Sequence, residues 1–306
     1  MTPTGTSASR DHASRPFVGS LRDAIAAHVR DGQTVALEGF THLIPFAAAH
    51  EIVRQGRRDL HLVRMTPDLI YDQMIGAGCA RALTFSWGGN PGVGSLHRLR
   101  DAVEHGWPHP LEIVEHSHAG LAAAYTAGAS NLPFGLLRGY VGTDLPAVNP
   151  QIRSVACPYT GEQIATVPAI RPDVTILHAQ KADRDGNVLL RGIVGAQREA
   201  GLAARVLLVT VEEVVDDLGA PMNALVLPHW VIAAIACVPG GAYPSYAQGY
   251  YARDNAFYAA WEAISRERDT FSTWMDRHVR RTADHRAFLA SLGAGAADGS
   301  QRGTPP

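Results

Sequence analysis

A glycine-rich segment contains the residues best suited to holding an anion. It reads SWGGNPGVGS over residues 86–95 and lies between a strand-like run and a helix-like run. Glycine lets backbone amides approach a ligand closely, and amides at a helix N-terminus favour negative charge. The segment has neither the GK[ST] of a phosphate-binding P-loop nor the GxGxxG of a dinucleotide site. We interpret it either as a loop that holds a carboxylate or phosphate, or as a turn that only needs positive φ angles.

Two histidines lie two positions apart in the segment EHSHAG. In an extended chain alternate side chains point to the same side, so His116 and His118 are expected to face one way. With Glu115 they could bind a metal ion, but the spacing indicates no third ligand. We expect instead that one of them donates hydrogen bonds or transfers protons, because open α/β sheets bind ligands at the carboxyl ends of strands. A surface role is the remaining alternative.

Two other polar features, the run at residues 183–187 and the single lysine, are not expected to be reactive or to bind a metal ion. The run DRDGN, residues 183–187, begins like a calcium loop, but Val194 occupies the position that requires a bidentate glutamate, so a hairpin turn is favoured. Lys181 is the only lysine and could form a Schiff base. At a strand end beside a polar turn, however, a lysine is ordinarily solvated.

A self-sufficient nucleophile motif is absent from the sequence. It contains neither the GxSxG elbow of an α/β-hydrolase nor a paired-carboxylate motif. The protein is therefore expected to be either a ligand-binding protein or one half of a shared active site.

Composition is that of an ordinary globular protein. Of its 306 residues, 46% are hydrophobic, which is enough to fill a sizeable core. A formal net charge of −2 and a pI near 6.7 argue against a dedicated nucleic-acid binder, which needs a concentrated basic surface. Three widely separated cysteines, Cys79, Cys157 and Cys237, support neither a disulfide framework nor a metal clip, so a reducing cytoplasm is expected.

The two ends of the chain are expected to be disordered tails. Residues 1–17 are polar and lack the apolar run of a signal peptide, and residues 292–306 are rich in glycine, proline and serine. No stretch approaches the roughly 20 apolar residues that span a bilayer, so we expect no membrane association. Residues 18–291 are expected to form one domain.

Strand-like and helix-like runs alternate along the chain. Ser20, three residues before Asp23, is typical of a helix N-cap, and the run LRDAIAAHV that follows places apolar side chains on one helical face. Apolar runs such as TVALE, DLHLVRM, RALTFSW and DVTILHAQ favour strands. Alternation of this kind predicts parallel pairing through right-handed crossovers. We therefore predict an α/β fold with an open, mostly parallel sheet flanked by helices, and C-terminal helices from Asp254 to about Leu292 packed over the sheet.

Five segments together carry a family resemblance. They read DGQTVALEGFTHLIP, RQGRRDLHLVRMTPDL, IGAGCARALTFSWGGNPGVGSLHRLRDAVE, RPDVTILHAQKADRDGNVLL and PGGAYPSYAQGYYARDNAFY. They resemble the A subunits of family I CoA-transferases, in the order found in that family, from about Leu21 to about Arg286. Within the family, the A subunits of the 3-oxoadipate group are similar to this chain, and those of the glutaconate group are more distant.

One family signature differs here at two positions. The pattern has an acidic-glycine turn, an apolar strand, GGF and a later G-x-P. Glu38 stands in place of the first glycine of GGF, and Leu43 in place of the glycine before the proline. The positions that match are Asp31, Gly32, Gly39, Phe40 and Pro45.

The resemblance implies that the nucleophile lies on a partner chain. In the family the B subunit carries a Ser-Glu-Asn-Gly motif whose glutamate attacks the acyl-CoA thioester, and this motif does not occur in the present sequence. The implied reaction moves CoA from succinyl-CoA to 3-oxoadipate, a dicarboxylic 3-oxo acid, in aromatic-compound degradation. A CoA thioester is then a substrate, with no permanently bound cofactor and no metal. A heterodimer or heterotetramer with the B subunit is expected.

The resemblance also implies roles for particular residues. Aligned backward from Leu132-Pro133-Phe134, His118 occupies the position where relatives carry a glutamine near the thioester, so it is expected to donate to the oxyanion or position the acid. The distal carboxylate needs a cation, and either Arg98 or Arg138 could supply it. The other implied substrate contacts are Gly39, Phe40, Thr41, Asn90, Gly92 and Ser95. The alternative for these two loops is that they only shape strand-to-helix turns.

Other functions are compatible with the same sequence features. The acid could be glutaconate or another short acid. Relatives with this fold also include CoA-thioester hydrolases and ring-opening enzymes, and related folds serve as non-catalytic ligand-binding modules. Pairing with a chain that carries the nucleophile would distinguish the transferase from the binding module.

Overall fold

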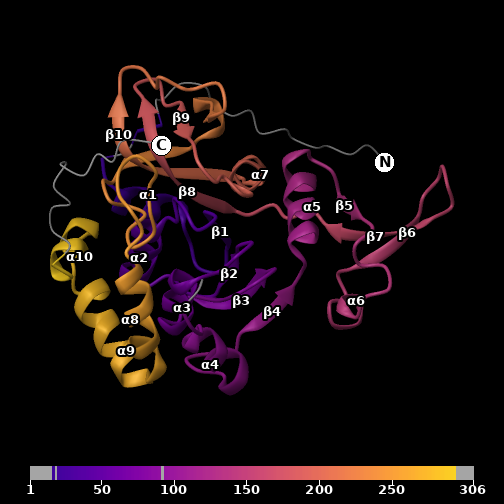
Figure 1. The fold of residues 1–306 in the computed structure, drawn as a ribbon, viewed down its shortest axis with the longest axis horizontal. Helices are drawn as coiled ribbons and strands as arrows, with labels where there is room; N and C mark the ends of the chain where they lie inside the picture. The colour runs from indigo at the N-terminus through magenta and orange to yellow at the C-terminus, as the bar shows by residue number, and fades with distance from the viewer. Residues whose placement is uncertain (1–15, 18, 91–92, 294–306) are drawn as a thin grey trace, which may run out of the picture.

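A central sheet runs through the molecule (Figure 1). The computed structural model describes residues 16–17, 19–90 and 93–293. Within these residues the sheet has nine strands: β1 (Thr34–Glu38), β2 (Leu60–Val63), β3 (Ala80–Phe85), β4 (Glu112–Glu115), β8 (Val174–Asp183), β9 (Val188–Leu190), β10 (Val206–Val215), β11 (Leu225–Leu227) and β12 (Ala234–Cys237).

The sheet is mostly parallel, which confirms the prediction from the alternating runs. β1 lies between β2 and β8, and β3 and β4 continue the sheet beyond β2, all in parallel. On the other edge of β8, β10 and then β12 also pair in parallel. β9 pairs antiparallel with β8 and β11, and the predicted hairpin turn at residues 183–187 joins β8 to β9. The carboxyl ends of β1 to β4 therefore meet at one edge, where open sheets of this kind bind ligands.

Helices cover the sheet on both faces and at its ends. They are α1 (Leu21–His28), α2 (Phe46–Arg54), α3 (Leu69–Gly76), α4 (His97–His105), α5 (His118–Ala129), α6 (Leu145–Val148), α7 (Gln197–Ala203), α8 (Asn255–Arg266), α9 (Arg268–Met275) and α10 (His285–Ser291), with a 3₁₀ turn at His229–Val231 and a π-helical turn at Asp276–Arg280. Ser20 caps α1 as predicted, because its hydroxyl accepts a hydrogen bond from the Asp23 amide at 3.1 Å.

A separate antiparallel sheet, which the alternating pattern does not predict, packs against α5. Its strands are β5 (Phe134–Leu137), β7 (Gln163–Pro168) and β6 (Arg153–Ala156), in the order β5-β7-β6. Figure 1 shows it beside α5, away from the central sheet. Ala165 and Val167 on its inner face form a small core with Ala124 of α5. We call this element the small sheet.

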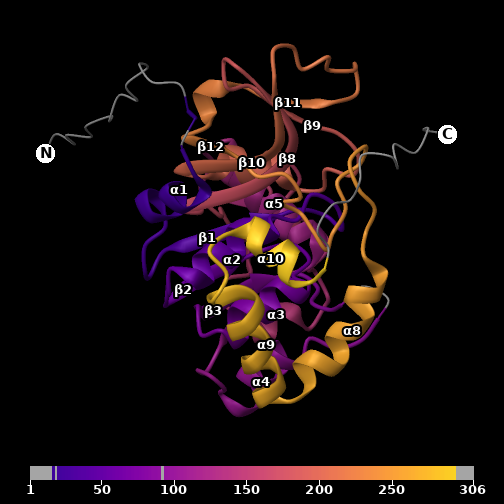
Figure 2. The same ribbon diagram turned by 90° about the vertical axis from the view of Figure 1, so that its left-hand side faces the viewer.

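The predicted C-terminal helices are present and lie over other helices. α8 packs against α4, and α10 packs against α2, so these helices form a further layer (Figure 2). Trp261 is fully buried in this layer, with its ring centroid 5.1 Å from that of Trp274 and 6.0 Å from that of Phe271. Its indole N–H donates to Asp72 of α3 at 2.9 Å. Burial of these aromatic rings joins the end of the chain to its first half.

The ends of the described chain make contacts of their own. Residues 1–15 and 294–306, most of the expected tails, lie outside the described residues. Within the range expected to be a tail, Phe17 forms a bridge to Ile235 of β12, and the Ile235 amide donates to the Pro16 carbonyl at 2.6 Å. None of the helices in the described ranges has the length and apolar character needed to cross a bilayer.

Two buried histidines make the fold sensitive to acid. Burial lowers the pKa of His42 and of His285 to about 4. His285 donates to the Gly240 carbonyl at 2.7 Å and lies in ring contact with Phe288. Because a histidine in an unfolded chain titrates near 6.5, the unfolded state binds protons between that pH and about 4 that the folded state does not bind. Acid in this interval therefore favours unfolding.

We expect the free energy of unfolding to fall between about pH 7.5 and about pH 5, by roughly 2 kcal/mol for each of these two histidines. His285→Gln keeps an N–H donor for the Gly240 carbonyl but removes the titrating ring, so its loss over the same interval should be smaller by about that amount. Urea unfolding of both proteins at the two pH values measures the difference. Equal losses in the two proteins would contradict the assignment.

Candidate active site

The turn that follows β1 has an unusual backbone. Thr41 and Leu43 have positive φ angles of 58° and 53°, a region that residues other than glycine rarely occupy. A Cβ at Gly39 would lie 2.7 Å from the Leu43 carbonyl oxygen, so this position requires glycine. A turn with this conformation persists only where its surroundings hold it.

Arg64, at the end of β2, holds one side of this turn. Its side chain is fully buried, and its guanidinium donates to the Gly39 carbonyl at 2.7 Å and to the Asp68 carboxylate at 3.0 Å. Asp68 also caps α3 by accepting from the Ile70 amide. A buried charge is tolerated when it is paired and hydrogen-bonded, and here the pairing joins the ends of β1 and β2 to the start of α3.

Glu38, the residue that replaces a family glycine, forms a second buried link. Its carboxyl group accepts from the Met65 amide and from the Tyr125 hydroxyl, each at 2.9 Å. Burial raises the pKa of Glu38, and the nearby Arg64 opposes that rise. The residue therefore connects β1, β2 and α5 directly beneath the turn.

The segment 238–251 holds the other side of the turn. The Ser245 hydroxyl donates to the Thr41 carbonyl at 2.9 Å, and the Leu43 amide donates to the Tyr246 carbonyl at 3.0 Å. Glu212 of β10 fixes this segment in turn, because its carboxylate accepts from the Gly240 amide at 2.7 Å.

Glu212 is part of a buried polar group that also includes His178. The two side chains are 2.7 Å apart, and the Tyr251 hydroxyl donates to the same carboxylate. Burial alone would raise the pKa of Glu212, but these hydrogen bonds and the Gly240 amide lower it below its ordinary value. The carboxylate is thus held in its charged form behind the 238–251 segment.

The two histidines of EHSHAG do not face the same way, so that expectation was wrong. The Ser117 hydroxyl accepts from the Gly120 amide and caps α5, so the chain turns into a helix between them. His116 is buried beside Tyr140, with Nδ1 3.3 Å from the phenol oxygen, and burial lowers its pKa. His118, the first residue of α5, is exposed.

His118 lies in a pocket between α5 and α7. The pocket has a volume of about 400 Å³ and is lined by Met65, His118, Ala119, Ala122, Thr126, Gly195, Ala196 and Glu199. Its walls are mostly small and apolar, and in the described part of the chain neither His118 nor Glu199 forms an ion pair. Both groups are therefore available to a ligand.

The pocket adjoins the turn after β1. A Cβ at Gly195 would lie 2.7 Å from Cβ of Phe40, so Phe40 packs directly against the pocket wall. The structure thereby places Phe40, one residue of the predicted group Gly39-Phe40-Thr41, behind the wall of the pocket that His118 lines. Open α/β sheets place ligand sites at this edge.

The glycine-rich loop holds an anion that belongs to the protein itself. The Ser95 amide donates to the Glu262 carboxylate of α8 at 3.0 Å, and a Cβ at Gly94 would lie 2.0 Å from the same group. The His97 ring lies 3.0 Å from this carboxylate, and this contact is the main cause that lowers the pKa of Glu262 to about 2. Asn90 anchors the loop by donating to a backbone carbonyl of α8 at 2.8 Å.

The loop is thus joined to α8 through Asn90 and Ser95, and the structure does not bring either residue to the His118 pocket. Gly92, the third predicted residue of this loop, lies outside the described residues.

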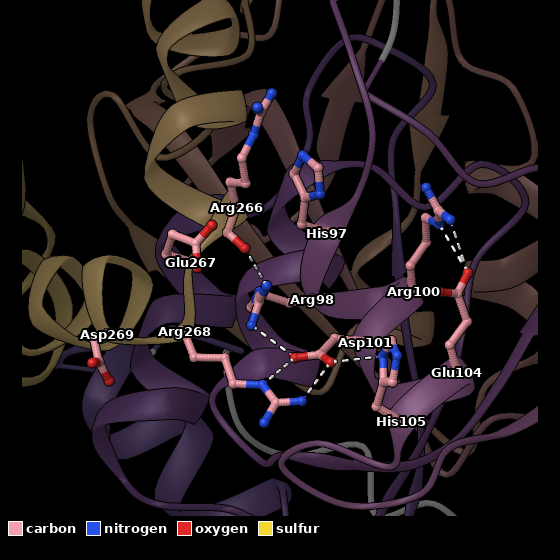
Figure 3. A pocket seen from close by; sticks show the side chains of 10 residues that line it. All are labelled: His97, Arg98, Arg100, Asp101, Glu104, His105, Arg266, Glu267, Arg268 and Asp269. Atoms are coloured by element: carbon pink, nitrogen blue, oxygen red, sulfur yellow. Dashed lines mark hydrogen bonds and ion pairs between the residues drawn. The ribbon is translucent and has the colours of Figure 1, made fainter.

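The two candidate arginines are found in different environments. Arg98 is buried between α4 and α9, where it donates to Asp101 at 2.8 Å and to the Arg266 carbonyl at 2.7 Å (Figure 3). Its guanidinium also lies over the Trp107 ring. Arg98 lines a pocket of about 520 Å³ formed mostly by charged side chains. This pocket and the His118 pocket have no lining residue in common. Arg138 follows β5 and is 74% exposed, with a two-pronged hydrogen bond to Glu162 at 2.8 Å.

Neither a metal site nor a reactive lysine is found. The described part of the chain contains no group of three His, Cys, Asp or Glu side chains that could hold a metal ion. Lys181 lies 3.4 Å from Glu213 and forms an ordinary ion pair with it.

Sequence patterns did not indicate several residues around the pocket. Arg64 and Glu199 follow no recognisable pattern, because their positions depend on tertiary contacts. Glu38, in contrast, was visible in the sequence as a charged residue where the family pattern has glycine.

A family model described as Coenzyme A transferase matches residues 18–237. The A subunit of the 3-oxoadipate CoA-transferase of Pseudomonas knackmussii is 67% identical over 276 residues, which are 90% of this chain and 98% of that protein. The A subunit of the glutaconate CoA-transferase of Acidaminococcus fermentans is 31% identical, over 90% of this chain and 92% of that protein.

Solved structures share the fold. The glutaconate coenzyme A-transferase of Acidaminococcus fermentans superimposes with a TM-score of 0.81 at 30% identity, over 90% of this chain and 92% of that chain. A variant of the decarboxylase AibA/AibB superimposes with a TM-score of 0.76 at 28% identity, over 86% of this chain and 100% of that chain.

A glycine pair tests how closely the turn and the pocket wall are packed. Gly195 and Gly219 have similar positive φ angles of 56° and 54°, but a Cβ at Gly219 would meet no atom within 4 Å. Both alanine variants should lose about 1 to 2 kcal/mol of unfolding free energy to the backbone conformation. Gly195→Ala should lose about 1 to 3 kcal/mol more, because of the clash with Phe40.

Urea unfolding of the two variants measures that difference. If Gly195→Ala is no less stable than Gly219→Ala, Phe40 does not pack against the pocket wall as described.

Proposed function

The chain belongs to the coenzyme A transferase family, and we propose that it is the A subunit of an enzyme that moves CoA from succinyl-CoA to 3-oxoadipate. The 67% identity to the A subunit of a 3-oxoadipate CoA-transferase, over 90% of this chain, carries the proposal. The A subunit of a glutaconate CoA-transferase is similar at 31% identity, which favours 3-oxoadipate over glutaconate. We place the reaction in the cytoplasm, in aromatic-compound degradation.

In the proposed reaction the nucleophile is a glutamate of a Ser-Glu-Asn-Gly motif on the partner B subunit. This carboxylate attacks the succinyl-CoA thioester, releases CoA as a thiolate and forms a mixed anhydride. The thiolate then attacks the glutamyl carbonyl, which releases succinate and leaves a glutamyl-CoA thioester. The acid 3-oxoadipate repeats these steps in reverse order and leaves as its CoA thioester.

His118 is the residue of this chain that we assign to the reacting atoms. Each step passes through a tetrahedral intermediate whose oxygen becomes negative, and a donor placed there is typically worth about 3 kcal/mol. The His118 ring is exposed in the pocket and has no ion pair among the described residues. It also lies at the N-terminus of α5, where the helix dipole favours negative charge.

Arg138 is better suited than Arg98 to bind the distal carboxylate of the acid. The charge of Arg98 is buried against Asp101. Arg138 pairs with Glu162 at the surface, where water screens the attraction, so a substrate carboxylate can replace Glu162. Arg138 is also two residues from Tyr140, whose hydroxyl accepts from the Ser117 amide at 2.9 Å, directly beside His118.

Substitutions of His118 in the complex with the B subunit test its role. We expect His118→Ala to lower kcat/KM by about 100-fold or more, because a donor to the oxyanion is lost. His118→Gln should retain much more activity, because the amide of glutamine can still donate. His109→Ala changes an exposed histidine that does not line the pocket and serves as the control. A change of less than about twofold in His118→Ala would remove the residue from the mechanism.

The substrates are tested by co-expressing the chain with a Ser-Glu-Asn-Gly chain and assaying transfer from succinyl-CoA to a set of acids. We expect 3-oxoadipate to have a higher kcat/KM than glutaconate or a monocarboxylic acid. Preferred turnover of another acid would refute the choice of substrate, and release of free CoA without an acid would indicate a hydrolase.

The same assay with Arg138→Gln tests whether Arg138 binds the distal carboxylate of the acid. This variant should raise KM for dicarboxylic acids and leave KM for a monocarboxylic acid unchanged. An equal effect on both kinds of acid would show that Arg138 does not bind that group.

A further inference from the structure

The pocket beside His118 is a groove that follows α5. Ala119, Ala122 and Thr126 line it, and their spacing of three and four residues places them in one row along the helix. From His118 to Thr126 the helix rises by about 12 Å. The opposite wall is the first turn of α7 and the residues just before it. A ligand that reaches from one end of the row to the other must therefore be an extended chain.

Few polar side chains line the groove, and one of them is an acid. His118 and Thr126 lie at the two ends of the row on α5, and Glu199 contributes a carboxyl group from the first turn of α7. Glu199 is half-buried, and its side chain forms no hydrogen bond or ion pair within the described ranges. In the same part of the chain, neither arginine nor lysine lines the groove. A carboxylate in this position attracts hydrogen-bond donors and repels other anions.

The charge of Glu199 excludes one part of the substrates and suits another. Succinate and 3-oxoadipate each carry two carboxylates. Either acid, laid along the groove, would bring a carboxylate close to Glu199 without a lining cation to compensate the repulsion. The pantetheine arm of CoA is, in contrast, an uncharged extended chain with two amide N–H donors, and it ends at the thioester sulfur. Its chemistry matches an elongated, mostly apolar groove that has a charged acceptor on one wall.

Helix α5 separates this groove from the side of the protein on which Arg138 lies. Leu121 and Tyr125 of α5 pack in a core shared with α7, whereas Ala124 packs against the small sheet, which Arg138 follows (Figure 1). In the proposed reaction the acid attacks while CoA is still held as a glutamyl thioester, so the acid and the CoA arm are present together. The two sides of α5 provide separate places for them, with His118 at the end of the helix.

We propose that the groove between α5 and α7 binds the pantetheine arm of the CoA thioester, and that Glu199 accepts a hydrogen bond from one of its amides. The inference rests on the proposed function, because that function supplies the CoA thioester. The arm runs from the thioester beside His118 toward Thr126, about two turns along α5. Glu199 thereby determines specificity, because it holds the CoA arm and keeps the carboxylates of the acids out of the groove.

The test measures both half-reactions in the complex with the Ser-Glu-Asn-Gly chain. Glu199→Ala should lower kcat/KM for succinyl-CoA by about tenfold or more, the size expected for a hydrogen bond to a charged acceptor. It should change kcat/KM for 3-oxoadipate by less than about twofold, because the acid does not enter the groove. Glu199→Gln keeps an acceptor oxygen and should retain more activity with succinyl-CoA than the alanine variant. Glu104→Ala, on α4, changes an exposed glutamate outside the groove and serves as the control.

A second measurement needs no CoA transfer. N-ethylpantothenamide is an uncharged analogue of the arm that keeps both amides, and its Kd for the complex can be measured by ligand-observed NMR. Glu199→Ala should weaken its binding by about tenfold. Ala122→Leu, which fills the groove one turn from His118, should weaken it by a similar factor. Thermal unfolding of each variant verifies that the chain folds.

Three results would overturn the groove as the pantetheine site while CoA transfer by the wild-type complex left the proposed function intact. They are an unchanged kcat/KM for succinyl-CoA in Glu199→Ala, equal losses with succinyl-CoA and 3-oxoadipate, and a loss confined to the acid. The last of these would show that the groove binds the acid instead. A wild-type complex that binds N-ethylpantothenamide through Glu199 but transfers no CoA would refute the proposed function and retain the groove.

Discussion

The Arg64 guanidinium connects the parts of the protein from which the pocket is built. It is fully buried and remains charged, so the fold must supply Asp68 and the Gly39 carbonyl in fixed positions. Those two groups belong to the start of α3 and the turn after β1, which thereby become one rigid unit with the end of β2. Loss of one partner would leave a buried charge without compensation, a change that typically costs about 3 to 5 kcal/mol. The positive φ angles of Thr41 and Leu43 persist because this unit and the 238–251 segment hold the turn from both sides.

The pocket consequently has a rigid inner wall and an open outer side. Buried hydrogen bonds of Glu38, Arg64 and Glu212 fix the wall, and none of these side chains lines the pocket. His118 and Glu199 project into the open space from the first turns of α5 and α7. Such a division suits the proposed function, in which the fixed wall keeps its geometry and a second chain approaches the exposed side of the pocket.

Short sequence patterns predicted much of the fold. The features that were not predicted depend on contacts between residues far apart in the sequence. The Ser20 cap, the parallel strands and the C-terminal helices follow from spacing over a few residues, and all are present. The small sheet escaped prediction because its strands are only four to six residues long and carry apolar and polar side chains on both faces, so they lack the alternation that marks a half-buried strand. The His116 and His118 side chains diverge because the Ser117 cap starts a helix between them. Anion binding was one of two interpretations of the glycine-rich loop, and the anion that the Ser95 amide binds, Glu262, lies 167 positions later in the chain.

That separation has a consequence for the order in which the protein can be made. During synthesis the N-terminal half emerges first, yet β1 needs β8 as a neighbour, and the Thr34 amide bonds to Asp173 across 139 positions. The glycine-rich loop must wait longer still, until α8 has left the ribosome with Glu262. Contacts of such long sequence separation form slowly, and the nascent chain exposes apolar strand edges in the meantime. Nascent chains that stall before α8 would therefore present chaperones and proteases with a nearly complete sheet. The loop after β3 would still lack the Glu262 carboxylate that accepts from the Ser95 amide.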